Sequence, residues 1–114
     1  MTAAFSIASL KLDPAKEAAH ISNSIRKIVA NRLKRQGVVV ALSGGIDSST
    51  VAALCVKALG KDKVFGLQLP ERHSADDTGY LSECLAAHLG IETVVQDITP
   101  VLEALGCYKK QEAA

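Results

Sequence analysis

The sequence predicts an α/β fold, a Rossmann-like parallel sheet with flanking helices. Three short apolar runs, 38–42, 63–69 and 91–95, alternate with segments of helical period. The first run is continuously apolar, which is typical of a strand that helices cover on both faces. A glycine-rich stretch, 43–49, joins this run to the next helical segment. Strands linked in this way by helices favour one parallel sheet with right-handed crossovers.

The first helix is predicted to begin at Asp13-Pro14, because Asp13 can cap the helix and proline is favoured at the first helical position. Apolar residues then recur on one face of the helix until Gly37, which is predicted to end it. These residues are Ile21, Ile25, Ile28, Val29 and Leu33. The first strand follows at 38–42.

The second helix is predicted at about 47–59, with Gly60 as its stop, and the second strand at 63–69, ended by Pro70. Ser74 is predicted to begin a third helix, with Asp76 and Asp77 in its first turn, where carboxylates stabilise the helix dipole. That helix is expected to run to Gly90. A third strand, 91–95, and a short helix, 99–105, complete the chain.

The stretch Ser-Gly-Gly-Ile-Asp-Ser-Ser at 43–49 is the strongest functional signal. A strand that turns through glycines into a helix presents free N–H groups and the positive end of a dipole, which suits phosphate. The hydroxyls of Ser43, Ser48 and Ser49 can add donors. No lysine follows Gly45, so this is not a Walker-type loop. Asp47 beside a phosphate needs a cation and is a candidate Mg²⁺ ligand. The simpler alternative is that Asp47 or Ser43 only caps the helix.

Composition narrows the classes of function. The 114 residues fit one small domain, and 13 basic against 12 acidic residues give no electrostatic case for nucleic acid or an anionic membrane. Small-molecule substrates are expected. Residues 1–12 lack the features of a signal peptide, so a cytoplasmic protein is expected. Cys55 and Cys84 are expected to pack on apolar helix faces as small hydrophobic residues.

The loop at 43–49 resembles the SGGxDS signature of the PP-loop ATP pyrophosphatases, the adenine nucleotide α-hydrolase superfamily. Within it, the chain is most similar to the ammonia- or glutamine-dependent NAD synthetase family. Several further segments carry that likeness, although only the loop is sharply specific. They are the amphipathic helix at 21–33, the strand at 38–42, Ala58-Leu59-Gly60, the strand from Val64 to Pro70, Leu89-Gly90-Ile91 and Asp97-Ile98.

The resemblance implies that Mg²⁺-ATP adenylates the nicotinate carboxylate of deamido-NAD with release of pyrophosphate, after which ammonia forms the amide of NAD. It implies Asp47 as the magnesium ligand and a homodimer, and leaves open whether ammonia or glutamine supplies the nitrogen. Ala41 stands where the family often has glycine. Gln68 is either a nucleotide contact or a solvent-facing polar residue. Arg72 and His73 either approach phosphate or are ordinary surface residues, and the surface alternative is favoured. The nucleotide-binding residues expected are Ala41, Leu42, Ser43, Gly44, Gly45, Ile46, Asp47, Ser48, Ser49 and Gln68.

The crevice of such a sheet lies where strand order reverses, between the first strand and one from a second half that is absent here. Residues 1–114 are therefore expected to form a single partial domain, the N-terminal part of the fold, with the first strand as an exposed edge unless a partner covers it. The family's catalytic groups beyond the loop lie downstream, so the chain is expected to bind ATP weakly and to be inactive alone. Other PP-loop activities, those of GMP synthetase, asparagine synthetase, or tRNA-modifying and sulfur-transfer enzymes, stay open, as does a non-catalytic nucleotide-binding or assembly module.

Overall fold

The computed structural model describes residues 4–114, and residues 1–3, part of the segment in which no signal peptide is expected, lie outside them. Three parallel strands form one sheet in the order β1-β2-β3: β1 (Val38–Ala41), β2 (Val64–Gln68) and β3 (Glu92–Val95). Val40 of β1 lies beside Gly66 of β2, which lies beside Thr93 of β3. The predicted α/β class with a parallel sheet is confirmed.

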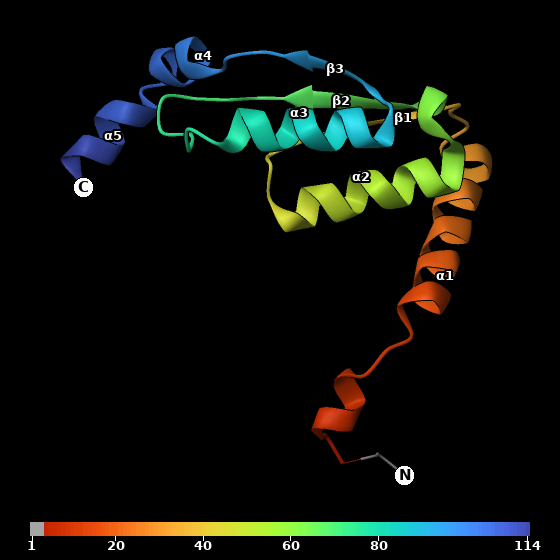
Figure 1. Ribbon diagram of the computed structural model, residues 1–114. Coiled ribbons are helices and arrows are strands. Elements are labelled where there is room, and N and C mark those ends of the chain that lie inside the picture. Colours follow the sequence, from red (N-terminus) through yellow and green to blue (C-terminus); the bar gives the residue numbers. More distant parts are fainter. Residues whose placement is uncertain (1–3) are drawn as a thin grey trace.

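Two helices, α2 (Ile46–Leu59) and α3 (Thr78–Leu89), cover the same face of the sheet (Figure 1). The preceding helix, α1 (Pro14–Lys27), packs against α2, and Asp13 caps it through a hydrogen bond from the Lys16 amide, as predicted. The core lies between the sheet and α2 and α3, and burying these apolar side chains stabilises the layered arrangement. Its buried members are Val40, Leu42, Ala52, Cys55, Val64, Ala86 and Ile91.

The opposite face of the sheet is open within residues 4–114. The side chains of Val39 and Val94, on β1 and β3, are 66% and 45% exposed, and Phe65 between them is 36% exposed. These residues alternate with the core residues along their strands, as the two-residue period of a strand requires. β1 is also an edge strand, so its outer N–H and C=O groups have no neighbouring strand in this part of the chain. Both features leave apolar side chains and strand-pairing groups uncovered in the described part of the chain.

Gly37 does not end the first helix, which corrects the prediction. A π-helical turn, η2 (Ile28–Arg32), follows α1, and the chain then reverses at Lys34, which has a φ of 53°. The Arg35 amide donates to the Val29 carbonyl oxygen at 2.9 Å, closing the helix end. Gly37 has another role: a Cβ at this position would lie 2.6 Å from the Lys63 carbonyl oxygen. Glycine there permits the close approach of the chain segments that lead into β1 and β2.

The prediction that α3 begins at Ser74 is also wrong. The helix begins at Thr78, and Ser74 instead accepts a hydrogen bond from the Glu71 amide at 2.9 Å, forming a turn before the helix. Ser74 and the two aspartates are equally typical of turns, and the turn is what forms. Cys84 is exposed, whereas Cys55 is buried as expected.

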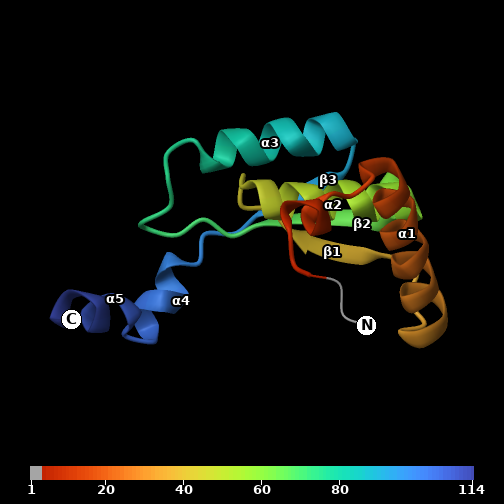
Figure 2. The same ribbon diagram turned by 90° about the horizontal axis from the view of Figure 1, so that it is seen from below.

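Short elements complete the chain. They are η1 (Ile7–Leu10), η3 (Lys61–Lys63), α4 (Thr99–Ala104) and α5 (Cys107–Ala113). Figure 2 shows α4 and α5 beyond the end of the sheet at which the strands finish. The sequence predicted α4 but not α5, because most of α5 is polar and only Tyr108 in it is buried.

Candidate functional site

The loop after β1 presents unpaired backbone donors. Gly44 has a φ of 77°, a conformation that disfavours any side chain, and Gly45 is the N-cap residue of α2. The first intrahelical hydrogen bond runs from the Ser49 amide to the Gly45 carbonyl oxygen at 3.2 Å. The amides of residues 46–48 therefore precede the helical ladder and can donate to an anion.

Two serines shape the loop rather than cap the helix. The Ser48 hydroxyl lies 3.0 Å from the Ser43 hydroxyl and accepts from the Ser43 amide at 3.1 Å, and the Ser43 hydroxyl accepts from the Gly45 amide at 3.3 Å. No side chain caps α2, so the alternative that Asp47 or Ser43 serves only as a cap is wrong. The Ser49 hydroxyl donates to the Gly45 carbonyl oxygen at 2.6 Å and is thereby turned into the helix.

A cavity of about 250 Å³ opens beside the loop, at the carboxyl ends of β1 and β2. Four of the predicted residues line it: Ala41, Leu42, Ser43 and Gln68. The remaining loop residues, 44–49, continue from its wall into the first turn of α2. Ligands of open parallel sheets bind at this end of the strands, so the structure brings the predicted residues together where such chemistry occurs.

Gln68 is the least expected feature of the cavity. Its side chain is only 4% exposed, so it is not the solvent-facing residue that the sequence allowed as an alternative. Its Nε2 is buried without a hydrogen-bond partner among the described residues. A buried amide donor without a partner costs free energy, and a ligand with an acceptor atom would relieve that cost.

Sequence reasoning missed one wall of the cavity, which α3 supplies. Small or polar residues recur there at helical spacing, Thr78 with Ser82 and Gly79 with Glu83, and this spacing was a usable signal. Ser82 is 1% exposed, and its hydroxyl donates to the Leu42 carbonyl oxygen at 3.5 Å. A Cβ on Gly44 would lie 3.0 Å from the Thr78 carbonyl oxygen, so loop and helix are in tight contact.

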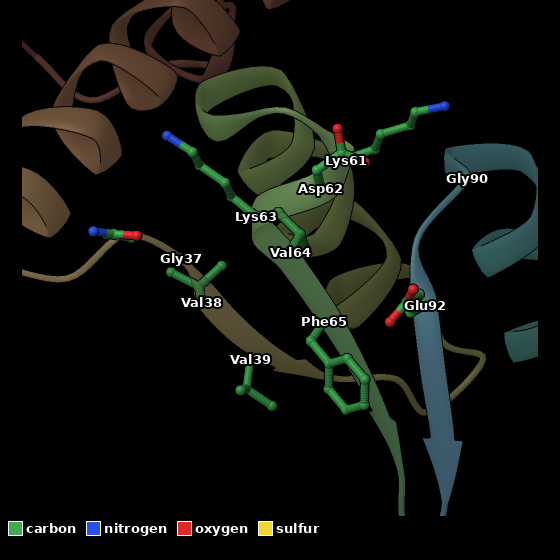
Figure 3. Close-up of a pocket in the computed structure, with 11 residues that line it drawn as sticks. Gly37, Val38, Val39, Lys61, Asp62, Lys63, Val64, Phe65, Gly90 and Glu92 are labelled. Atoms are coloured by element: carbon green, nitrogen blue, oxygen red, sulfur yellow. The ribbon is translucent and has the colours of Figure 1, made fainter.

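A larger hollow, of about 670 Å³, lies at the other end of the sheet (Figure 3). Lys61, Lys63 and Glu92 line it, and the ammonium groups of the two lysines extend away from one another. The carboxyl ends of α2 and α3 lie on this side, where the helix dipole disfavours anions. The cavity beside the loop is therefore the better candidate for binding a phosphate compound.

Comparison with known proteins identifies the family of the chain. The family described as NAD synthase matches residues 17–114. The chain belongs to the NAD synthase family. It is 53% identical to the NH(3)-dependent NAD(+) synthetase of Mesorhizobium japonicum over 90% of this chain but 32% of that protein, so it spans about a third of the relative's length.

Solved structures of NAD synthase relatives show the same arrangement of elements. The NH3-dependent NAD synthetase of Campylobacter jejuni superposes with a TM-score of 0.75 at 36% identity, covering 88% of this chain and 42% of that one. The NMN synthetase of Francisella tularensis gives 0.77 at 26% identity, covering 89% and 41%. The sheet described above therefore matches part of the fold of these longer relatives.

A magnesium ion at Asp47 would need further ligands from a bound phosphate compound. Asp47 is exposed in the first turn of α2, next to the free amides. No group of three or more His, Cys, Asp or Glu residues able to hold a metal occurs within residues 4–114. Mg²⁺ is commonly held by one or two carboxylates together with substrate phosphates, and Asp47 beside an anion site supplies such a carboxylate.

Proposed function

We propose that the chain is the ATP-binding part of an NAD synthase. The reaction proposed for the complete enzyme is adenylation of the nicotinate carboxylate of deamido-NAD by ATP, release of pyrophosphate, and attack of ammonia to give NAD. The observation that carries the proposal is the combination of free amides at 46–48 with the adjoining cavity and its unpaired Gln68 side chain. Family membership supports the choice of reaction.

Each part of the site has a distinct task. The amides of residues 46–48 and the Ser43–Ser48 hydroxyl pair hold the β and γ phosphates, the leaving group. The residues at 41–45 set the path of the backbone around these phosphates. The cavity receives the nucleoside, where the Gln68 amide finds its missing acceptor. Asp47 holds Mg²⁺, which would neutralise charge that develops on the phosphates.

The nitrogen donor is proposed to be ammonia, because the relative with 53% identity is named as NH(3)-dependent. The remaining two thirds of a complete enzyme are proposed to supply the deamido-NAD pocket and the homodimer contacts. No helix within residues 4–114 is long and apolar enough to cross a membrane. A cytoplasmic enzyme acting on small molecules is proposed from the family.

The test is a titration of the 114-residue chain with ATP in the presence and absence of Mg²⁺. Asp47→Asn is expected to weaken binding of Mg²⁺-ATP by tenfold or more, since it removes the carboxylate that bridges metal and protein. Metal-free ATP should bind to this variant as well as or better than to the unaltered chain, because a negative charge beside the phosphates is removed. Asp62→Asn, at the other end of the sheet, is the matched control. Equal Mg²⁺ dependence in all three proteins would contradict the role of Asp47 and favour a non-catalytic module.

The likeness to the NMN synthetase supports a second candidate, amidation of the corresponding mononucleotide. The two candidate reactions use different carboxylate substrates and the same ATP site. Pyrophosphate release by the complete enzyme with deamido-NAD, and not with nicotinate mononucleotide, would establish the first candidate. Release with the mononucleotide alone would replace it.

A further inference from the structure

The turn between β2 and α3 forms a rim of the candidate nucleotide cavity. Pro70 and Ser74 both line the cavity, and Glu71, Arg72 and His73 connect them on the outside. The Ser74 amide donates to the Glu71 carbonyl oxygen at 3.0 Å, and the Glu71 amide donates back to the Ser74 hydroxyl at 2.9 Å. Whatever fixes residues 71–73 therefore fixes the rim.

One residue from the distant C-terminal helix holds this turn. Tyr108 of α5 is 6% exposed, and its hydroxyl donates to Glu71 Oε2 at 2.6 Å and accepts from the Arg72 amide at 3.3 Å. The other oxygen of Glu71 accepts from the His73 amide at 2.9 Å. The Tyr108 hydroxyl is therefore connected to Glu71 and Arg72 directly, and to His73 through the Glu71 carboxylate.

The ring of Tyr108 adds two further contacts. The Arg72 guanidinium lies 4.1 Å above the ring centroid, within the range of a cation–π interaction, and Arg72 also pairs with Glu103 of α4. The His73 ring meets the Tyr108 ring edge to face, with centroids 5.4 Å apart. Arg72 and His73 are exposed, as the favoured sequence prediction had it, and both also contact the Tyr108 ring.

We propose that Tyr108 is a positioning residue for ATP, which fixes the 71–74 turn as the rim against which the nucleoside binds. The proposal rests on the proposed function, because it assigns the nucleoside to the cavity that Pro70 and Ser74 line. The proposal assigns the phosphates and the nucleoside of ATP to different parts of the site. The phosphates meet the loop at 43–49, which Tyr108 does not touch, and only the nucleoside meets the rim.

The test compares ATP with inorganic pyrophosphate as ligands of the 114-residue chain. Tyr108→Phe keeps the ring and removes the hydroxyl, so ATP is expected to bind about threefold to tenfold more weakly, the usual effect of one lost hydrogen bond. Pyrophosphate should bind as it does to the unaltered chain. Tyr80→Phe, which alters an exposed tyrosine of α3, is the matched control and should change neither affinity.

A variant that disturbs folding would weaken the binding of both ligands. Weaker binding of ATP with unchanged binding of pyrophosphate therefore identifies Tyr108 as a positioning residue. Glu71→Gln should reproduce the effect, and the double variant should add little to either single one, because both act in one hydrogen-bond chain. If the unaltered chain binds ATP and Tyr108→Phe binds it equally well, the role of Tyr108 is overturned and the proposed function stands. If the unaltered chain binds neither ligand, both are overturned.

Discussion

Gly44 is the residue on which the loop geometry most depends. It combines a φ of 77° with tight contact to the first turn of α3, where a Cβ would meet the Thr78 carbonyl oxygen and, at 3.2 Å, the Leu81 Cβ. The positive φ makes a side chain at this position moderately unfavourable. The close contact with α3 also leaves no room for one. A change at Gly44 should therefore displace the loop from α3 and from the cavity.

Gly44→Ala is predicted to destabilise the fold and to abolish measurable pyrophosphate binding. Gly60→Ala is the matched control, since Gly60 has a φ of 88° and no atom near the position of a Cβ. Both variants should lose about 1–3 kcal/mol from backbone strain, with a further loss only at Gly44. Urea denaturation and pyrophosphate titration measure the two effects. Normal binding by Gly44→Ala would show that the loop tolerates displacement.

At the scale of elements, the sequence predicted all three strands and most helices, because their apolar periodicity coincides with the buried positions. It misplaced the start of α3, where Ser74 and two aspartates suit a turn and a helix start equally well. It missed α5, whose role depends on a single contact residue, Tyr108.

In the candidate site, the loop was predictable from local glycine and serine chemistry. The burial of Gln68 was not, since it depends on helices packed over β2.

The docking of α5 is predicted to weaken in acid. The hydroxyl of Tyr108, followed by the His73 amide, stabilises the carboxylate of Glu71 and lowers its pKa below the ordinary value of about 4.5. A group with a lowered folded pKa contributes stability above its unfolded pKa, and this is lost as pH falls through the folded pKa. Asp97 also has a lowered pKa, through the Thr99 amide, and titrates in the same acidic range.

Amide hydrogen exchange at Arg72 and His73, followed from pH 6 downward, measures this loss after correction for intrinsic rates. Protection should fall in the acidic range, below about pH 4.5. Glu71→Gln should abolish the pH dependence at these two amides, whereas Asp97→Asn should leave it in place. Constant protection of His73 down to pH 2 would contradict a role for the ionised carboxylate.

For the whole molecule, the open face and edge of the sheet dominate. Val39, Phe65 and Val94 are exposed on a face that helices would cover in a complete α/β sheet, and β1 has no outer neighbour in the described part of the chain. The chain spans about a third of the length of its 53% identical relative, and a partial domain stays a prediction. Exposed apolar edges favour association.

The 114-residue chain is therefore predicted to self-associate through this face. Val39→Lys places a charge on the edge strand and should shift association to at least tenfold higher concentration, since it removes the burial of about one valine side chain per copy. Val51→Lys is the matched control, because Val51 is 50% exposed on α2. Sedimentation velocity over a concentration series measures the shift. An equal shift in both variants would assign the effect to net charge alone.

β1 is at once the open edge of the sheet and the strand that leads into the phosphate loop. A polypeptide that pairs with β1 in parallel would bring the end of its own strand next to residues 42–45. Completing the sheet and completing the catalytic centre would then be one event. An enzyme supplied as two pieces divided after this segment would behave as a complementation pair, and its turnover would report how much of the two pieces had assembled.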